Sequence, residues 1–283
     1  MEYPRIGNIQ LDGFALLAPM AGVSDLAYRV IARKMGAALT TAEMVSAKGL
    51  YYHNEKTKDM LKIAEEEHPV SLQIFGSDPA VMALGAKVME KAGADIVDIN
   101  MGCPVPKVVN NGEGSALLKN IPLAAKIIEK TVKAIDKPVT VKFRKGFGAD
   151  EVQAIEMAKA AEAGGADAVS LINTLTGMKI DINRRTFALA NKTGGMSGPA
   201  VKPVAVRMVY QVANAVNIPI LGMGGIRTAE DALEFIMAGA AMVAVGTANF
   251  NNPAATTDVI DGIAEFMDKN GVKDINELIG CVK

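Results

Sequence analysis

The chain has 283 residues and a formal net charge of −1, and half of its residues are apolar. This length suits one large α/β barrel or two ordinary domains. The balanced charge does not mark the whole chain as a binder of polyanions. The lack of tryptophan argues against an aromatic platform for single-stranded nucleic acid.

Eight short apolar runs recur along the chain and are separated by longer amphipathic stretches. Seven of the runs follow either a Gly-Ala pair, which ends a helix, or a proline, which can begin a strand without losing a ladder hydrogen bond, and the apolar run at 14–19 completes the set. In chain order they are residues 14–19, 35–41, 68–74, 92–99, 137–142, 163–171, 217–222 and 238–245. The stretches between them, among them 81–92, 121–135, 151–163 and 229–238, have helical periodicity.

This eightfold alternation of strand and helix predicts a closed (β/α)₈ TIM barrel that occupies residues 1–283 as a single domain. An open, doubly wound sheet is the alternative. It is disfavoured because no Gly-x-Gly-x-x-Gly follows the first strand. Catalytic groups of a barrel lie where its strands end. Polar residues and glycines follow every predicted strand here, and ordinary turns explain that whole set poorly.

Cys103 lies just past the fourth predicted strand, between Gly102 and Pro104. A thiol at the mouth of a buried strand is poorly placed for packing and well placed for proton transfer. Its ordinary pKa of about 8.5 can be tuned toward neutral pH. A small buried hydrophobic residue is the structural alternative for this cysteine.

Glycine-rich loops follow the last two predicted strands. Gly222-Met-Gly-Gly-Ile-Arg-Thr-Ala-Glu-Asp231 opens a helix, and Gly246-Thr-Ala-Asn249 follows strand eight. Backbone N–H groups of such loops can approach an anion, and these two loops are the usual phosphate site of TIM barrels. A third glycine loop, Thr193–Pro203, lies in the long segment 174–202, for which we expect a lid or a cofactor wall.

The first half of the chain resembles the tRNA-dihydrouridine synthases over roughly residues 5–147. The matching motifs are Leu17-Ala-Pro-Met-Ala-Gly22, Glu43-Met-Val-Ser-Ala-Lys48, Leu72-Gln-Ile-Phe-Gly76, Asp98-Ile-Asn-Met-Gly-Cys-Pro-Val105 and Val141-Lys-Phe-Arg-Lys-Gly146. The resemblance implies an FMN-dependent TIM barrel that reduces uridine in tRNA.

The second half, roughly residues 168–283, resembles the class 1B dihydroorotate dehydrogenases. The matching motifs are Ile172-Asn-Thr-Leu-Thr-Gly-Met178, Leu189-Ala-Asn-Lys-Thr-Gly-Gly-Met-Ser-Gly-Pro199, Gly222-Met-Gly-Gly225 and Val245-Gly-Thr-Ala-Asn-Phe250. We therefore expect a composite of residues 1–150 (strands one to five) and 151–283 (strands six to eight). Its expected join lies between Gly146 and Ala168, and its expected origin is recombination or design.

Both families bind FMN and act on the C5–C6 bond of a uracil-type ring, so the two resemblances imply one set of roles. Pro19, Met20 and Ala21 would line the flavin, Gln73 would bind its pyrimidine edge, and Lys142 would lie at its N1–C2 edge. The phosphate would be bound by Ser197, Gly198, Gly224, Gly225, Gly246 and Thr247. Cys103 would be the general acid or base, and Asn100, Asn173 and Thr174 would face the substrate. Independently, a lysine at the end of a buried strand is costly without an anionic partner.

The expected substrate is a small pyrimidine or a uridine of tRNA, and a homodimer is implied by the class 1B resemblance. Two distant cysteines, with no secretory or membrane-spanning stretch, predict a cytoplasmic protein. His53 and His68 are too far apart to predict a metal site.

Three functions remain open from the sequence. The first is an FMN-binding flavoprotein with residual or no turnover. The second is an active tRNA-dihydrouridine synthase or dihydroorotate dehydrogenase. The third is a barrel scaffold without a cofactor.

Overall fold

The computed structural model describes residues 3–282 and shows eight parallel strands closed into a barrel. The strands are β3 (Ala15–Leu17), β4 (Thr40–Thr41), β6 (Val70–Phe75), β7 (Ile96–Met101), β8 (Val139–Phe143), β9 (Ala168–Leu171), β14 (Ile220–Met223) and β15 (Met242–Val245). Pairing of β15 with β3 and of β4 with β6 closes the ring. The predicted TIM barrel is therefore confirmed, and each predicted apolar run overlaps one of these strands; β6, β7, β8 and β14 extend one or two residues beyond their runs.

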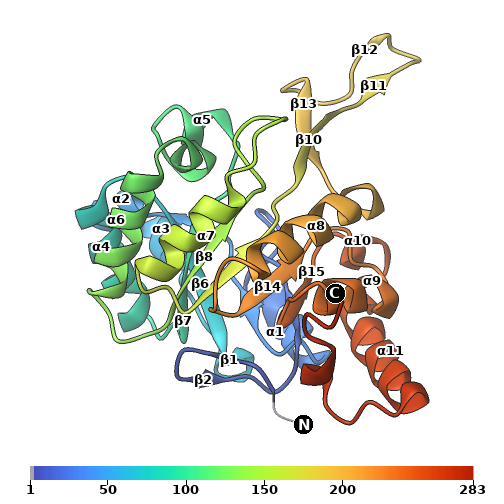
Figure 1. Cartoon of the computed structure of the whole chain (residues 1–283). Helices are drawn as coiled ribbons and strands as arrows, with labels where there is room; N and C mark the ends of the chain where they lie inside the picture. The colour runs from blue at the N-terminus through green and yellow to red at the C-terminus, as the bar shows by residue number, and fades with distance from the viewer. Residues whose placement is uncertain (1–2, 283) are drawn as a thin grey trace.

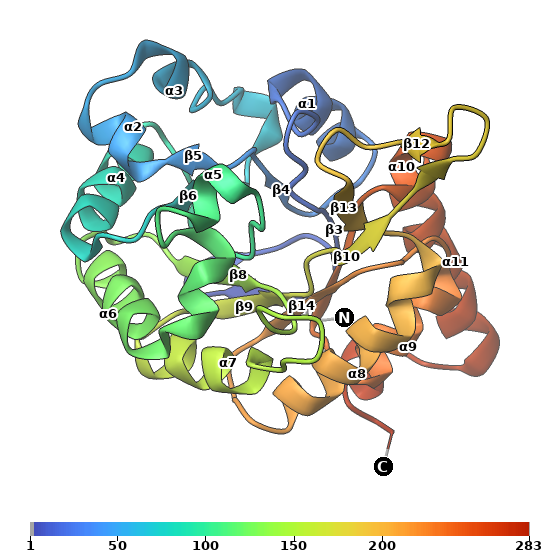
Figure 2. The same cartoon turned by 90° about the horizontal axis from the view of Figure 1, so that it is seen from above.

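Helices surround the barrel, as the view from above shows (Figure 2). They are α1 (Leu26–Lys34), α2 (Ala47–Tyr51), α3 (Glu55–Asp59), α4 (Pro79–Lys91), α5 (Pro106–Val109), α6 (Ile121–Val132), α7 (Ala154–Ala163), α8 (Lys202–Ala213), α9 (Ala229–Met237), α10 (Ala248–Asn251) and α11 (Ala255–Asn270). Short 3₁₀ helices cover Glu65–Glu67, Gly114–Lys119, Pro199–Val201 and Ile275–Leu278. The predicted helix-to-strand glycines lie in the left-handed region, as at Gly93 (φ +99°) after α4.

The barrel interior is partly polar, and this decides where the site lies. Buried polar side chains on the strands include Ser71, Gln73, Asp98, Asn100, Thr140, Lys142 and Ser170. The opposite strand faces pack apolar side chains against the surrounding helices. Buried polar groups are stabilised by hydrogen-bond partners, and Gln73, Asp98, Asn100 and Thr140 form one connected network, whereas Ser71 Oγ has no partner among the described residues.

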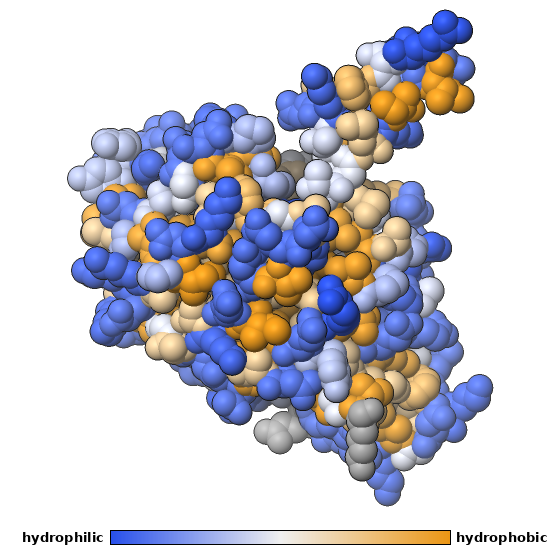
Figure 3. Space-filling model, turned by 45° about the horizontal axis from the view of Figure 1, so that its top comes forward, coloured by the Kyte–Doolittle hydropathy of each residue, from blue (hydrophilic) through white to orange (hydrophobic). Residues whose placement is uncertain are grey.

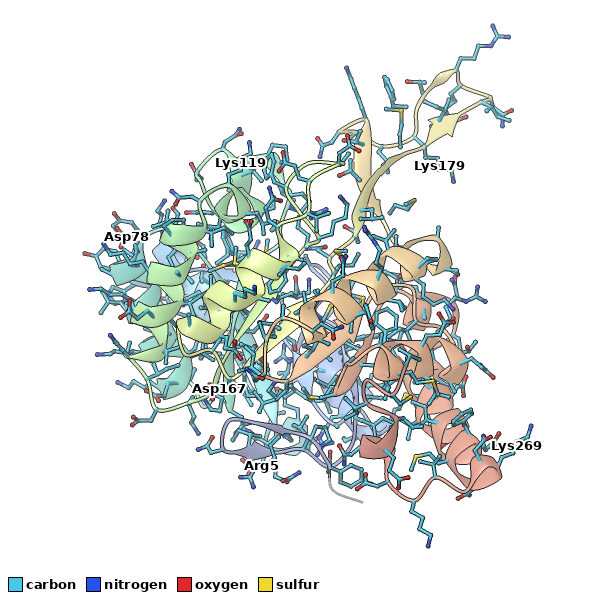
Figure 4. The ribbon with its side chains drawn as sticks, in the orientation of Figure 1. Arg5, Asp78, Lys119, Asp167, Lys179 and Lys269 are labelled. Carbon is cyan, nitrogen blue, oxygen red and sulfur yellow. The ribbon has the colours of Figure 1, made fainter. Side chains whose placement is uncertain are left out.

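A short hairpin covers the end of the barrel at which the strands begin. Its strands are β1 (Arg5–Ile6) and β2 (Ile9–Gln10), and Ile6 is buried. A Cβ on Gly7 would lie 2.7 Å from the Asp167 carboxylate, directly before β9, so hairpin and barrel are in close contact. Arg5 and Asp167 mark this end in Figure 4, with Lys119 toward the opposite end.

A two-part hairpin, here called the arm, projects from the opposite end of the barrel (Figure 1). It consists of β10 (Leu175–Met178) paired with β13 (Thr193–Met196), and beyond them β11 (Ile180–Asp181) paired with β12 (Thr186–Phe187). Figure 3 shows it standing clear of the molecule, with apolar residues beside a hydrophilic tip. The arm belongs to the segment expected to form a lid or wall. Only the two ends of that segment contribute to the pockets described below.

Within residues 3–282, the structure contains no helix that combines the length and apolar character needed to cross a membrane. The same residues hold no group of three or more histidine, cysteine, aspartate or glutamate side chains arranged to bind a metal ion.

Candidate active site

Two adjoining pockets open where the barrel strands end. The larger, about 420 Å³, is lined by the glycine loops and is called the cradle pocket; the smaller, about 210 Å³, contains Cys103 and is called the thiol pocket. They share Pro19, Met20, Lys142 and Asn173. Every residue predicted for the site lines one pocket or both, so the structure brings the whole predicted set together. The roles of these residues stay predictions.

The cradle pocket is built by loops after β9, β14 and β15. Its polar floor is formed by Ser197, Gly198, Gly224, Gly225, Gly246 and Thr247. Thr247 Oγ1 lies 3.0 Å from Ser197 Oγ and joins the loop that follows the arm to the loop that follows β15. Gly225 (φ +85°) lies so near the Gly198 carbonyl that a Cβ would be 2.7 Å from it. These glycines therefore let two backbone segments meet beside one anion-sized space.

Arg227 also lines the cradle pocket, and sequence reasoning assigned it no role. The nearby Lys202 is held by Asp231 at 2.7 Å and Glu234 at 2.5 Å, which raise its pKa. Arg227 takes part in none of the ion pairs between residues that the structure describes. Its guanidinium is therefore available to a phosphate, and its place two residues after Gly225 was the signal that could have identified it.

The cradle pocket fits the phosphate end of FMN in both space and chemistry. A Cβ on Gly198 would meet no protein atom within 4 Å, so this glycine borders open space. Two hydroxyls, loop N–H groups and a guanidinium form the donor set that a phosphate requires. Pro19, Met20, Ile172 and Met223 offer apolar walls to a flat ring.

Cys103 lies at the wall of the thiol pocket and is 6% exposed. Burial raises the pKa of this thiol, and the backbone N–H of Val105 and the charges of Lys142 and Arg144 oppose the rise. The thiol is therefore protonated at neutral pH and gains thiolate character only as the pH increases.

A chain of side-chain amides fixes the loop of Cys103. Asn100 Oδ1 accepts hydrogen bonds from the backbone N–H groups of Gly102 at 3.0 Å and Cys103 at 2.9 Å. Asn100 Nδ2 donates to Gln73 Oε1 at 2.8 Å. Asn173 Nδ2 donates to the Gly102 carbonyl at 2.8 Å. Both asparagines therefore hold the loop and also line the thiol pocket, where their remaining donor capacity can serve a ligand.

Lys142 ends β8 where the two pockets meet, and it is 5% exposed. Burial lowers its pKa to about 8; Asp98 and Cys103 act to raise it, and Arg144 acts to lower it. No carboxylate within residues 3–282 forms an ion pair with it. An anionic group in the pocket would therefore stabilise the charged form, as a reduced flavin would at its N1–C2 edge.

Arg144 is a second residue to which the sequence gave no role. It is 5% exposed, and its two terminal nitrogens donate to the carbonyls of Gly102 at 2.6 Å and Thr174 at 2.5 Å. It thereby joins the Cys103 loop to the loop after β9. Its position two residues beyond Lys142, on the same face of the strand, was the available signal.

Replacing Lys142 with methionine is expected to lower the midpoint potential of bound FMN by about 30 to 60 mV. Each 30 mV of a two-electron couple corresponds to about 1.4 kcal/mol. The reason is loss of a positive charge beside the reduced flavin. Because the pKa of Lys142 is about 8, the difference in midpoint potential should be present below that pH and fade above it.

Potentiometric titration from neutral to alkaline pH measures this difference. Lys87→Met, an exposed change on α4, is the control, and equal potentials in all three proteins would contradict the assignment.

The barrel, the phosphate cradle and the thiol facing a shared pocket define a flavin-type TIM-barrel oxidoreductase. The family model of the dihydrouridine synthases matches residues 16–276. The chain belongs to the FMN-dependent TIM-barrel oxidoreductases that include these synthases and the catalytic subunits of dihydroorotate dehydrogenase B.

Curated relatives support the similarity to the catalytic subunits of dihydroorotate dehydrogenase B. The chain is 54% identical over 227 residues to the catalytic subunit of dihydroorotate dehydrogenase B (NAD(+)) of Lachnoclostridium phytofermentans, covering 80% of this chain and 73% of that protein. The subunits of the same name from Alkaliphilus oremlandii and Alkaliphilus metalliredigens are 52% and 51% identical. Each match covers 69% of this chain, and 63% and 62% of those proteins, respectively.

Both matches extend across the expected boundary between the two halves of the chain. The synthase model runs from residue 16 through the expected join to residue 276. The dehydrogenase match of 227 residues is longer than the entire segment after the join, so it extends well into the first half. Both resemblances are therefore supported, whereas a recombined or designed origin is not.

Proposed function

We propose that this protein is an active FMN-dependent oxidoreductase that oxidises dihydroorotate at the C5–C6 bond. The observation that carries the proposal is the thiol pocket, in which Cys103 faces a space that shares Lys142 with the phosphate-cradling pocket. In this proposal the flavin occupies the cradle pocket, Cys103 acts from the adjoining thiol pocket, and the ring of the substrate lies between them. The three curated relatives named above are catalytic subunits of dihydroorotate dehydrogenase B, and they favour this substrate.

FMN, when bound, supplies the two-electron chemistry of the reaction. The chain supplies the rest: Cys103 Sγ takes the proton from C5 of the ring, and Asn100 and Asn173 hold the polar edge of the ring through their free donors. Lys142 keeps a positive charge where negative charge accumulates. Met44, Pro104 and Val105 form the apolar side of the thiol pocket and limit the access of water.

Reduction of uridine in tRNA is the second candidate. It is favoured by the synthase model across nearly the whole chain and by the protonated state of Cys103, which suits a proton donor at C5. In that direction the same thiol gives its proton to the ring.

Product analysis separates the two candidates. FMN-loaded protein is given dihydroorotate and an artificial electron acceptor, and separately a chemical reductant and unmodified tRNA. We expect orotate in the first reaction, at a rate that rises with pH because the raised pKa of Cys103 limits the thiolate fraction. Dihydrouridine in the tRNA together with no orotate would replace the proposal with the second candidate. The predicted homodimer is measured in the same preparation by its mass in solution.

A further inference from the structure

A line of hydrogen bonds reaches the Cys103 loop from the barrel interior, and it begins at Asp98. This residue lies on β7 and is 4% exposed. Its Oδ2 accepts from Gln73 Nε2 at 2.6 Å, and its Oδ1 accepts from Thr140 Oγ1 at 2.5 Å. Gln73 and Thr140 are its register partners on β6 and β8, so three adjacent strands supply the arrangement.

The carboxylate gives this line its direction. Burial raises the pKa of Asp98, and the hydrogen bonds from Thr140 and Gln73 and the charge of Lys142 oppose that rise and favour the ionised form. The ionised carboxylate only accepts hydrogen bonds, so Gln73 presents its Nε2 to Asp98. Gln73 Oε1 is then free to accept from Asn100, and Asn100 Oδ1 is free to accept from the backbone of Gly102 and Cys103. The orientation of two amides and of the catalytic loop therefore depends on one buried carboxylate.

The same carboxylate is the buried negative charge that acts on Lys142. Asp98 and Lys142 line one small cavity of the barrel interior, and the polar side chains of Ser71, Thr140 and Ser170 line it with them. Gln73 is the register partner of Asp98 on β6, and Asn100 is that of Lys142 on β7. The charged or titratable neighbours are Arg144 and Cys103. Of these groups, Asp98 and Cys103 favour the protonated ammonium of Lys142, and among the charges that act on Lys142 the effect of Asp98 is the largest.

We propose that Asp98 is a positioning residue of this site: from inside the barrel it orients the Gln73–Asn100 chain that anchors the Cys103 loop, and it supplies the counter-charge of Lys142. Asp98 lines neither the cradle pocket nor the thiol pocket, so it acts through these residues. The inference concerns the predicted flavin site and is independent of the choice between dihydroorotate and tRNA.

The charge is tested in FMN-free protein by the titration of Lys142. With ¹³C-labelled lysine, a signal that titrates near pH 8 and disappears in Lys142→Met identifies the residue. Asp98→Asn removes the charge; its amide oxygen can still accept from Gln73, and its amide N–H group can donate to the Thr140 hydroxyl, which reverses that hydrogen bond. We expect it to lower the midpoint by at least about one pH unit, a tenfold change in the protonation constant. Asp261→Asn on the exposed side of α11 is the matched control and should leave the midpoint unchanged. An unchanged Lys142 midpoint in Asp98→Asn would overturn the proposal that Asp98 supplies the counter-charge of Lys142.

The positioning is tested by hydrogen exchange of the Gly102 and Cys103 amides. Asp98→Ala should speed this exchange at least about tenfold, and Asp98→Asn should restore most of the protection. If Asp98→Ala does not fold, Gln73→Leu breaks the chain at its middle and should speed the exchange while Lys142 still titrates near pH 8. Unchanged exchange in the folded variants would overturn the positioning role. Because no readout requires FMN or turnover, the result is distinguishable from failure of the proposed function.

Discussion

A Cys103→Ala protein is expected to bind FMN normally and to lose about 100-fold or more of its rate of reaction with dihydroorotate. Positioned general acids and bases contribute roughly 10²–10⁴ in rate, and Cys103 lines the thiol pocket with a titratable side chain. Single-turnover kinetics measure the reaction, and flavin absorbance measures the bound cofactor.

The second cysteine provides the matched control for this substitution. Cys281 is exposed near the end of the chain and lines neither pocket. Cys281→Ala should keep the full rate. An equal rate in Cys103→Ala and the unaltered protein would remove the thiol from the mechanism, whichever pyrimidine is the substrate.

A Gly225→Ala protein is expected to lose FMN affinity by roughly 30-fold or more, which corresponds to about 2 kcal/mol. Gly225 has φ +85°, which disfavours any residue with a side chain. Its new Cβ would also lie 2.7 Å from the Gly198 carbonyl and 3.0 Å from the Lys202 backbone nitrogen. These are backbone atoms, so the loop of Ser197 and Gly198 must move and the cradle must widen. Fluorescence titration with FMN measures the affinity.

Gly271→Ala separates the effect of backbone strain on stability from the effect of a displaced cradle loop on FMN affinity. Gly271 follows α11 with φ +67° and has no neighbouring atom within 4 Å of a built Cβ. This variant should be destabilised to a similar degree by its backbone conformation, yet bind FMN like the unaltered protein. A matching loss of affinity in both variants would attribute the Gly225 effect to general destabilisation.

Seven of the eight barrel strands were predictable because two local signals agree, whereas β3 was predicted from its apolar run alone. A glycine after a helix or a proline before a strand marks the boundary, and a continuous apolar run marks burial on both faces. The run before Asn100 and Cys103 shows this, since β7 occupies Ile96–Met101 with all of its residues buried. The phosphate loops were predictable for a related reason, because glycines placed directly after strands have few purely structural explanations.

The segments that connect the barrel strands were less predictable than the strands themselves. The short strand β5 (Val45–Ser46) and the helices α2 and α3 lie in a stretch without clear periodicity. The segment 174–202 was expected to cover the site, but its middle forms the projecting arm. Its composition of alternating apolar and basic residues does not specify whether such a hairpin folds over the barrel or away from it.

The network beneath the site could not be read from the sequence. Asp98 looked like one residue of a motif, and its contacts with Gln73 and Thr140 depend on the register of three strands. Arg144 was visible at a strand end, but its bonds to Gly102 and Thr174 join loops that are distant in sequence. Long-range register and loop closure are properties of the folded barrel, whereas the local pattern establishes only which residues reach its mouth.

The most direct test of the account is an anaerobic stopped-flow experiment in which FMN-loaded protein is mixed with dihydroorotate. The account predicts complete bleaching of the oxidised flavin spectrum in a single turnover, faster at alkaline than at neutral pH, with one orotate formed per flavin. An oxidised flavin spectrum that persists in the presence of saturating dihydroorotate would contradict it.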